Sequence, residues 1–177
     1  MRTKPLKGRE LLESTTSMET VRKIGELGAD VLASPKMQGL RGFIQHGRVT
    51  RYDHCLAVCY IALRMAQRLN IAVDERSMVR GALLHDYFLY DWHDPDNLRP
   101  LHGFTHPGEA LRSALEEFEL NAVERNVIHR HMFPLTPVPP RYREALLVSL
   151  ADKISAVLET FGVRSEMRVI SLCRSVR

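Results

Sequence analysis

The feature that most limits what this chain can fold into is its helical periodicity. Along residues 51–69 (RYDHCLAVCYIALRMAQRL) apolar side chains recur at steps of three and four, the spacing of one face of an α-helix. Similar patterns predict helices over residues 18–33, about 75–90, about 121–132 and about 141–161. No segment shows the convincing alternation of a strand. We therefore predict an all-α fold without a sheet.

Capping residues and prolines predict where several helices begin and where one segment is not helical. Asp74 can cap the helix that follows it, and Asn121 with Glu124 resembles a capping box. Pro107 is predicted to open a helix, since proline is favoured in the first turn. The segment 133–140 (FPLTPVPP) is expected to be non-helical because its prolines block continuation. Residues 91–105, rich in Asp, Pro, Gly and His, are expected to form a loop.

Composition narrows the class of protein. The formal net charge of +4 suits an anionic substrate without requiring one. The start of the chain lacks the apolar core of a signal peptide, and no segment reaches the roughly 18 apolar residues of a membrane span. The three cysteines, Cys55, Cys59 and Cys173, are an odd and sparse set that favours reduced thiols and a cytoplasmic protein. Cys55 and Cys59 are expected to pack as small apolar residues.

The candidate functional residues are histidines and aspartates far apart in the sequence. Eight histidines are present, and in chain order the candidates are His54, the pair His85-Asp86, His106, His131 and Asp152. Imidazole nitrogens and carboxylate oxygens suit Mn²⁺, Fe, Co, Zn²⁺ or Mg²⁺. Each of these residues taken singly is more simply a hydrogen-bonded core residue. Their coincidence favours a metal site.

Helical phase indicates that these side chains can face inward together. His54 shares a face with Val58 and neighbouring apolar residues, and His131 follows Ile128 by three residues. His129, in contrast, falls on a polar face that we expect to be solvated. Asp152 lies one turn from Val148 inside an apolar helix, where an unpaired carboxylate is costly unless it is bound to a cation.

These motifs resemble the HD superfamily of metal-dependent phosphohydrolases. The order His54…His85-Asp86…Asp152 matches its signature, within the contexts YDHCLAV, GALLHD and SLADK. The segments FTHPGEAL and VIHRHMFPL resemble the extra histidine segments of HD proteins that hold two metals. The resemblance covers roughly residues 46–161 and implies an all-α HD-domain helical bundle with a central metal site.

The resemblance leaves the subfamily unassigned. Tyr87-Phe88 stands where one variant has Ile-Gly, and Leu89-Tyr90 stands where alarmone hydrolases have Glu-Asp. No Gly-Tyr-Pro follows the later histidines, which removes the cyclic-di-GMP phosphodiesterase signature. The domain division that follows is an N-terminal helical extension (1–45), the HD domain (46–165) and a basic C-terminal tail (166–177).

The resemblance implies hydrolysis of a phosphate ester by metal-activated hydroxide, with a nucleotide or another small phosphorylated metabolite as substrate. One or two divalent ions are expected, drawn from Mn, Fe, Co, Mg, Ni and Zn, with manganese a leading candidate. His54, His85, Asp86 and Asp152 would hold the first ion. His106 and His131 would hold a second ion, with the catalytic Asp86 bridging the two.

Further roles are expected for polar residues near these ligands. Lys153, Arg51 and His46 are candidates to bind the phosphate, with Lys153 also catalytic. The loop residues Asp91, His93, Asp94 and His102 are candidates to protonate the leaving group, although a plain polar loop explains them too. We expect no membrane partner and no specific nucleic acid, and a homodimer is compatible with the sequence. Two other functions remain open: a non-catalytic HD module that binds a nucleotide or metal, and an HD-type di-iron oxygenase.

Overall fold

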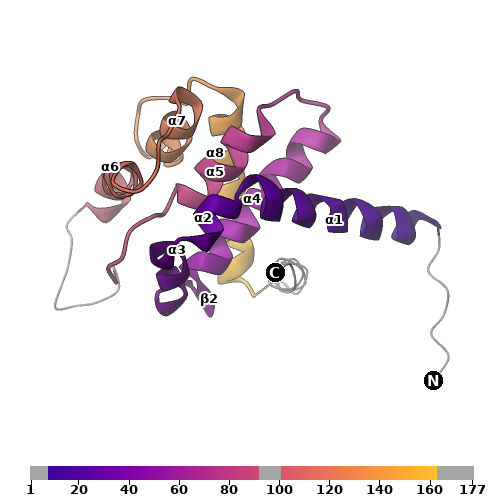
Figure 1. The fold of residues 1–177 in the computed structure, drawn as a ribbon, viewed down its shortest axis with the longest axis horizontal. Helices are drawn as coiled ribbons and strands as arrows, with labels where there is room; N and C mark the ends of the chain where they lie inside the picture. Colours follow the sequence, from indigo (N-terminus) through magenta and orange to yellow (C-terminus); the bar gives the residue numbers. More distant parts are fainter. Residues whose placement is uncertain (1–7, 92–100, 163–177) are drawn as a thin grey trace.

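The chain folds into a bundle of helices with one small hairpin (Figure 1). The computed structural model describes residues 8–91 and 101–162. In these ranges the helices are α1 (Gly8–Leu27), α2 (Ala29–Ala33), α3 (Pro35–Gly39), η1 (Leu40–Gly42, a 3₁₀ turn), α4 (Arg51–Arg68), α5 (Glu75–Leu84), α6 (His102–Leu115), α7 (Ala122–Arg130) and α8 (Arg143–Thr160). The strands are β1 (Ile44–His46) and β2 (Val49–Thr50). The predicted all-α class is confirmed.

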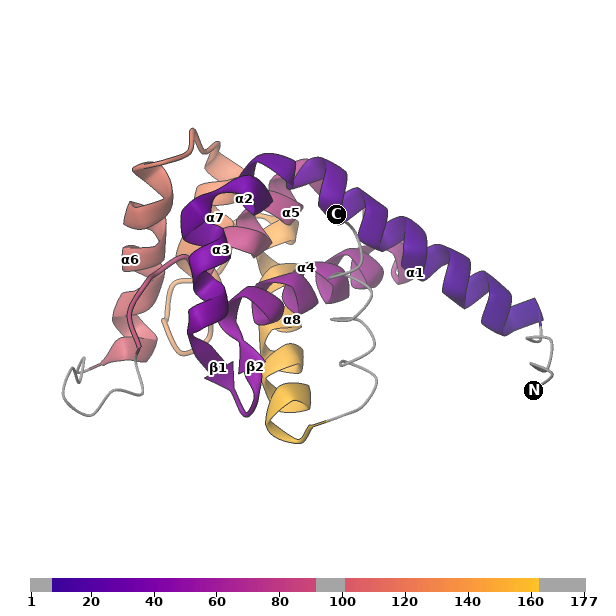
Figure 2. The same ribbon diagram turned by 60° about the horizontal axis from the view of Figure 1, so that its bottom comes forward.

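Helix α4 occupies the centre of the bundle. Its residues are buried on most sides, as expected for a segment that is apolar over more than one face. It packs against α5 and α8, while α7 packs against both α5 and α8, and α6 packs against α7. Helix α1 crosses α4 and α5 and extends beyond them toward its N-terminal end (Figure 2). The C-terminal ends of α5 and α7 and the middle of α8 therefore surround one interior region.

The helix caps follow the sequence signals. The Asp74 carboxylate accepts from the backbone N–H of Ser77 at 3.1 Å. Asn121 and Glu124 form the expected capping box, with reciprocal bonds of 2.9 and 2.8 Å between side chain and backbone N–H. Residues 133–140 form no helix, as their prolines predict.

The expectation of no sheet is wrong at residues 44–50. Strands β1 and β2 pair antiparallel, with Ile44 opposite Thr50 and His46 opposite Val49. The turn between them depends on Gly47, whose φ of +57° is a left-handed conformation that glycine adopts without a side-chain clash. The two strands are only three and two residues long, which is too short to show an alternating pattern in the sequence.

Two predicted helix boundaries also need correction. Helix α5 ends at Leu84 rather than near residue 90, and the N–H groups of Tyr87 and Phe88 donate to the carbonyls of Leu84 and Asp86 instead of to carbonyls four residues earlier. Helix α6 begins at His102, not at Pro107, and Pro107 lies inside it. His106 is therefore within the helix and not in front of it.

The helix expected over residues 18–33 is two helices. Helix α1 runs to Leu27 and α2 starts at Ala29, with Gly28 at the corner. A Cβ at Gly28 would lie 2.4 Å from Cδ1 of Leu83, so the corner sits directly on α5. None of the helices in the described ranges is long and apolar enough to cross a membrane. The predicted tail, residues 166–177, lies outside those ranges.

Candidate metal centre

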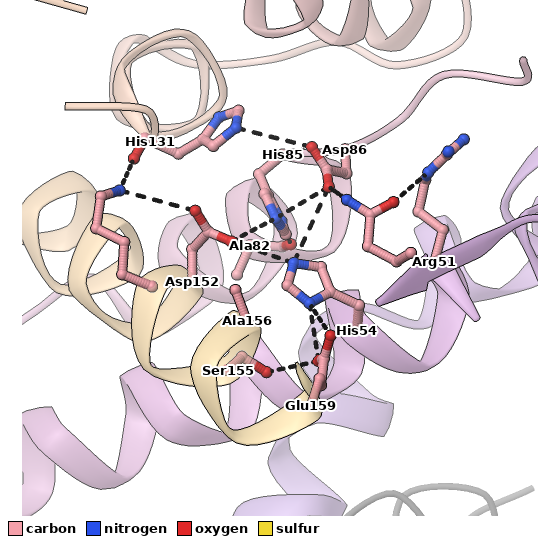
Figure 3. A network of polar contacts seen from close by, with 12 residues as sticks. Arg51, His54, Ala82, His85, Asp86, His131, Asp152, Ser155, Ala156 and Glu159 are labelled. Carbon is pink, nitrogen blue, oxygen red and sulfur yellow. Dashed lines mark hydrogen bonds and ion pairs between the residues drawn. The ribbon is translucent and has the colours of Figure 1, made fainter. Parts of the chain in front are cut away.

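Five helices bring the predicted ligands into one buried cluster. His54 lies in the first turn of α4, His85 and Asp86 directly follow α5, and Asp152 lies in the middle of α8. His106 comes from α6, and His131 is the residue after α7. The Asp152 side chain is mostly buried, with an exposed fraction of 13%, and the other five side chains are buried. Figure 3 shows His54, His85, His131 and Asp152 directed toward the region around Asp86.

The first group of ligand atoms consists of two imidazoles and two carboxylates. The Nε2 atom of His54 lies 3.2 Å from Oδ1 of Asp152 and 4.0 Å from Oδ2 of Asp86. The Nε2 atom of His85 lies 3.7 Å from the same Asp86 oxygen and 3.8 Å from the same Asp152 oxygen. These are the four residues predicted for one ion, and the structure brings all four together.

The second group uses the other oxygen of Asp86. His106 Nε2 lies 3.3 Å and His131 Nε2 lies 3.7 Å from Asp86 Oδ1. The two Nε2 atoms are 2.8 Å apart. Asp86 thus faces each group with a different carboxylate oxygen, which is the arrangement of a carboxylate that bridges two ions.

Hydrogen bonds at Nδ1 fix the orientation of the histidine rings. His85 Nδ1 is 2.7 Å from the carbonyl of Ala82, and His131 Nδ1 is 2.7 Å from the carbonyl of Ile128. His106 Nδ1 is 2.9 Å from the carbonyl of His102. A carbonyl can only accept, so each Nδ1 carries a proton, and a ring without a second proton presents its Nε2 lone pair to the cluster. Metal-binding histidines are oriented in this way.

The cluster therefore consists almost entirely of hydrogen-bond acceptors. The Nε2 lone pairs of His106 and His131 approach within 2.8 Å, an arrangement that requires a proton or a cation between them. The Nε2 atom of His85 is buried and has no hydrogen-bond partner among the residues that the structure describes. Buried acceptors in this state are costly. The donor set fits divalent cations, with imidazole and carboxylate ligands and no thiolate.

The electrostatics of the cluster favour positive charge. Burial alone would raise the pKa of Asp86, but the surrounding histidines, His85 first, hold the pKa of this carboxyl well below its usual range. Burial and the neighbouring His106 lower the pKa of His131 to about 3. Burial would also lower the pKa of His54, but the carboxylates of Glu159 and Asp152 outweigh it and raise that pKa well above its usual value. An ionised Asp86 and a neutral His131 are the forms that bind a cation.

Glu159 is a member of the site that the sequence analysis missed. Its buried carboxylate accepts from His54 Nδ1 at 2.8 Å and from the Ser155 hydroxyl at 2.8 Å. Glu159 follows Asp152 by seven residues, two helical turns, so it lies on the same face of α8. That spacing is the signal that would have identified it.

Arg51 and Gln45 form a chain of contacts that ends at Asp86, and Figure 3 labels Arg51 and Asp86 at its two ends. Arg51 Nε donates to Gln45 Oε1 at 2.9 Å, and Gln45 Nε2 donates to Asp86 Oδ2 at 2.6 Å. Arg51 is fully buried and also donates to the carbonyls of Phe88 and Tyr90. It is not among the residues that line the cavity described below, so its contact with the site runs through Gln45, and its binding of a phosphate stays a prediction.

A cavity of about 740 Å³ opens onto the cluster. One part of its wall is apolar, formed by Met132, Pro134 and Leu135. His46 and Lys153, two of the predicted phosphate-binding residues, also line it. The Lys153 ammonium donates to the carbonyl of His131 at 2.8 Å and lies 3.8 Å from Asp152 Oδ2. Burial is the main cause that lowers the pKa of both His46 and Lys153.

The loop residues proposed as proton donors are only partly described. His102 lines the cavity and stacks on His106, with ring centroids 4.7 Å apart. Burial, followed by His106, lowers the pKa of His102 to about 4, so a neutral His102 is expected at neutral pH. Asp91 lies on the exposed chain before the loop, and His93 and Asp94 lie outside the described residues. His129 is exposed on α7, as its polar face predicts, and unlike His131 it does not join the cluster.

Comparison with known proteins gives one match. The model of one protein family, described as HD domain, matches residues 51–157, more than half of the chain. The matched segment contains all six predicted ligands and ends two residues before Glu159. No curated protein and no solved structure matches the chain.

Proposed function

This chain belongs to the HD domain family, and from that premise we propose that it is a metal-dependent phosphohydrolase. Its substrate in this proposal is a phosphate ester of a nucleotide or another small phosphorylated metabolite. The observation that carries the proposal is the position of Asp86. Its two carboxylate oxygens face two separate groups of inward Nε2 lone pairs, at a cavity that a small molecule can enter.

The two groups of ligand atoms would hold one or two divalent ions. His54, His85, Asp86 and Asp152 would bind the first, and His106, His131 and Asp86 the second. When bound, such ions supply a water nucleophile of lowered pKa and positive charge for the phosphoryl oxygens.

The remaining residues hold this arrangement in place. The carbonyls of Ala82, Ile128 and His102 keep three imidazole rings turned toward the cluster, and the Glu159 carboxylate does the same for His54. The Gln45 amide holds Asp86 by one oxygen and leaves the other directed at His106 and His131. Ligands held from behind in this way need little rearrangement when a cation binds.

Lys153 and His46 are placed to act on the phosphate. The Lys153 ammonium already donates to the carbonyl of His131 and to Ser149, so in this proposal it attracts the phosphate through its charge at the cavity wall. His46 lies on the cavity wall next to His54, with ring centroids 5.6 Å apart. A cavity of about 740 Å³ is within the range of small-molecule sites. Its apolar wall suits the non-phosphate part of an ester.

Metal analysis followed by an activity screen tests the proposal. Purified protein is analysed for bound Mn, Fe, Co, Ni, Zn and Mg, and phosphate release is then measured on phosphomonoesters, nucleotides and dinucleotides with added Mn²⁺, Co²⁺ or Mg²⁺. We expect metal-dependent phosphate release that is lost in Asp86→Asn. Oxygen-dependent product formation with iron would instead support a di-iron oxygenase. Tight nucleotide binding without turnover would support a regulatory module.

A further inference from the structure

Helix α8 has an exposed face that is apolar along its whole length. Its large exposed side chains are Leu146, Leu150, Ile154, Val157 and Phe161, with exposed fractions of 46, 44, 42, 56 and 79%. They recur at steps of four, four, three and four residues, so they form one stripe on the helix. We refer to these five residues as the α8 stripe. The stripe faces away from the metal centre, because the buried ligands Asp152 and Glu159 alternate with it.

The face that carries the α8 stripe is apolar except for Lys153 at its edge, whose side chain is 38% exposed. Between Leu146 and Phe161 the charged residues of the helix are Asp152, Lys153 and Glu159, and each is engaged on the side of the metal centre. The one other exposed position in this range is Thr160, whose hydroxyl donates to the carbonyl of Ala156. An exposed helix face normally carries charged residues, and a long apolar face with so few of them marks an interaction site.

The stripe residues are spaced almost symmetrically along the helix, so their spacing is nearly the same when the helix is reversed. Positions 146 and 161 have the same midpoint as positions 150 and 157, between residues 153 and 154, and Ile154 lies next to that midpoint. An antiparallel copy of α8 would therefore bring Leu146 against Phe161 and Leu150 against Val157, with Ile154 and Lys153 of both copies next to the axis. A twofold interface requires this kind of self-complementary surface.

We propose that the α8 stripe is the interface of a homodimer in which two copies of α8 pack antiparallel about a twofold axis near Ile154. The area is sufficient. With ordinary side-chain areas, the exposed parts of the five residues amount to roughly 500 Å² on each copy, so two copies bring together roughly 1,000 Å², near the lower bound for a specific interface. The charged group nearest the axis is the Lys153 ammonium, which donates to the carbonyls of His131 and Ser149.

Charge substitutions at one predicted contact test both the interface and its register. The mass of the full chain is measured by light scattering over a range of concentrations, and the parent is expected to have twice the monomer mass of 20.3 kDa. Leu150→Glu and Val157→Lys should each raise the dimer dissociation constant roughly 100-fold or more, because the twofold axis places each change at the interface twice. The double variant Leu150→Glu/Val157→Lys should regain the dimer, since each Glu then meets a Lys of the other copy.

A matched control separates this effect from a general effect of surface charge. Leu115, at the end of α6, has an exposed fraction of 43%, nearly the same as that of Leu150, and lies outside the stripe. Leu115→Glu should leave the dimer intact. Circular dichroism of every variant checks that the helices remain folded. A dimer that persists in both single variants would overturn the proposal, as would a double variant that stays monomeric.

A monomeric parent would also overturn the proposal, and one further variant would then identify the occupant of the stripe. Residues 163–177 begin two positions after Phe161 and include Met167, Val169, Ile170 and Leu172. If a variant that ends at residue 162 becomes dimeric while the parent is monomeric, the stripe is covered by the chain's own C-terminal segment. If both have the same dimer affinity, these residues do not compete for the stripe, as the proposal expects.

Discussion

At the scale of single residues, Asp86 is the residue that faces both groups of ligand atoms. One of its oxygens lies near His54 and His85, and the other lies near His106 and His131. Gln45 accepts a hydrogen bond from Arg51 and donates one to the Asp86 carboxylate, which fixes the orientation of that carboxylate. Substitution of any one of these histidines affects one group of ligands, whereas substitution of Asp86 affects both groups.

The two groups of ligands predict different metal contents for two variants. His131→Ala removes a ligand of the second group only, so this variant should retain one ion per chain and lose most of its activity. Asp152→Ala removes a ligand of the first group and should lose that ion as well. Metal per chain is measured by elemental analysis after gel filtration. If His131→Ala binds as much metal as the parent, the two-ion arrangement is wrong and His131 serves the substrate instead.

Glu159 offers a test of orientation without loss of a ligand. Glu159→Gln preserves the size of the side chain but removes the charge that faces His54 Nδ1. We expect metal affinity to fall about 10- to 100-fold, because the second partner of a ligand histidine fixes its ring and raises its basicity. Affinity is measured by titration of metal-free protein. Glu26→Gln, an exposed change on α1, is the control and should bind metal like the parent.

At the scale of helices, the close contact between α5 and α7 positions the ligands that follow both. A Cβ at Gly81 would lie 2.7 Å from Cβ of Val127, so the two helices touch where this glycine stands. His85 and Asp86 follow Gly81 by little more than one turn, and His131 follows Val127 by four residues. The separation of the two helices therefore sets the separation of the two groups of ligands.

Gly81→Ala should destabilise the protein although alanine is the better helix former. The propensity gain is about 1 kcal/mol, whereas overpacking in a close-packed core costs about 1–3 kcal/mol. We expect a net loss of up to about 2 kcal/mol in the free energy of unfolding, measured by urea denaturation. Gly108→Ala on α6 is the matched control, because a Cβ there meets nothing within 4 Å. A Gly81→Ala variant as stable as the parent would show that α7 can shift freely.

At the scale of the whole molecule, a bound cation would join five helices. The ligands come from α4, α6 and α8 and from the ends of α5 and α7, so an ion bound to the folded chain is a cross-link that the unfolded chain lacks. Binding to the folded state alone stabilises it by about 2.7 kcal/mol when the ion is present at 100 times its dissociation constant.

Removal of metal should therefore lower the melting temperature. For a chain of this size, a loss of about 2.7 kcal/mol corresponds to a fall of roughly 5–10 °C. Calorimetry of metal-loaded and chelator-treated protein measures the difference, and re-addition of Mn²⁺ should restore it. Asp152→Ala should show a much smaller difference. An equal shift in parent and variant would place the stabilising ion elsewhere.

The sequence was sufficient for residues whose positions follow from helical phase. His54, His131 and Asp152 each lie on an apolar face, and their placement in the core follows from that alone. Gln45 and Arg51 were beyond such reasoning, because the first lies in a strand too short to show a period and the second is oriented by contacts with distant carbonyls. His106 was predicted to face inward from a position before its helix. It does face inward, but from within α6.

The distribution of ligands along the chain has a consequence for biosynthesis. His54 and Asp152 are 98 residues apart, yet their ligand atoms lie 3.2 Å from each other. A nascent chain on the ribosome exposes His54, His85 and Asp86 well before α8 has left the exit tunnel, and translation proceeds at roughly 5–20 residues per second. For several seconds the early ligands are therefore present without Asp152 and Glu159. The four ligands predicted for the first ion can come together only after α8 docks, so that complete set exists only in a chain that has already folded.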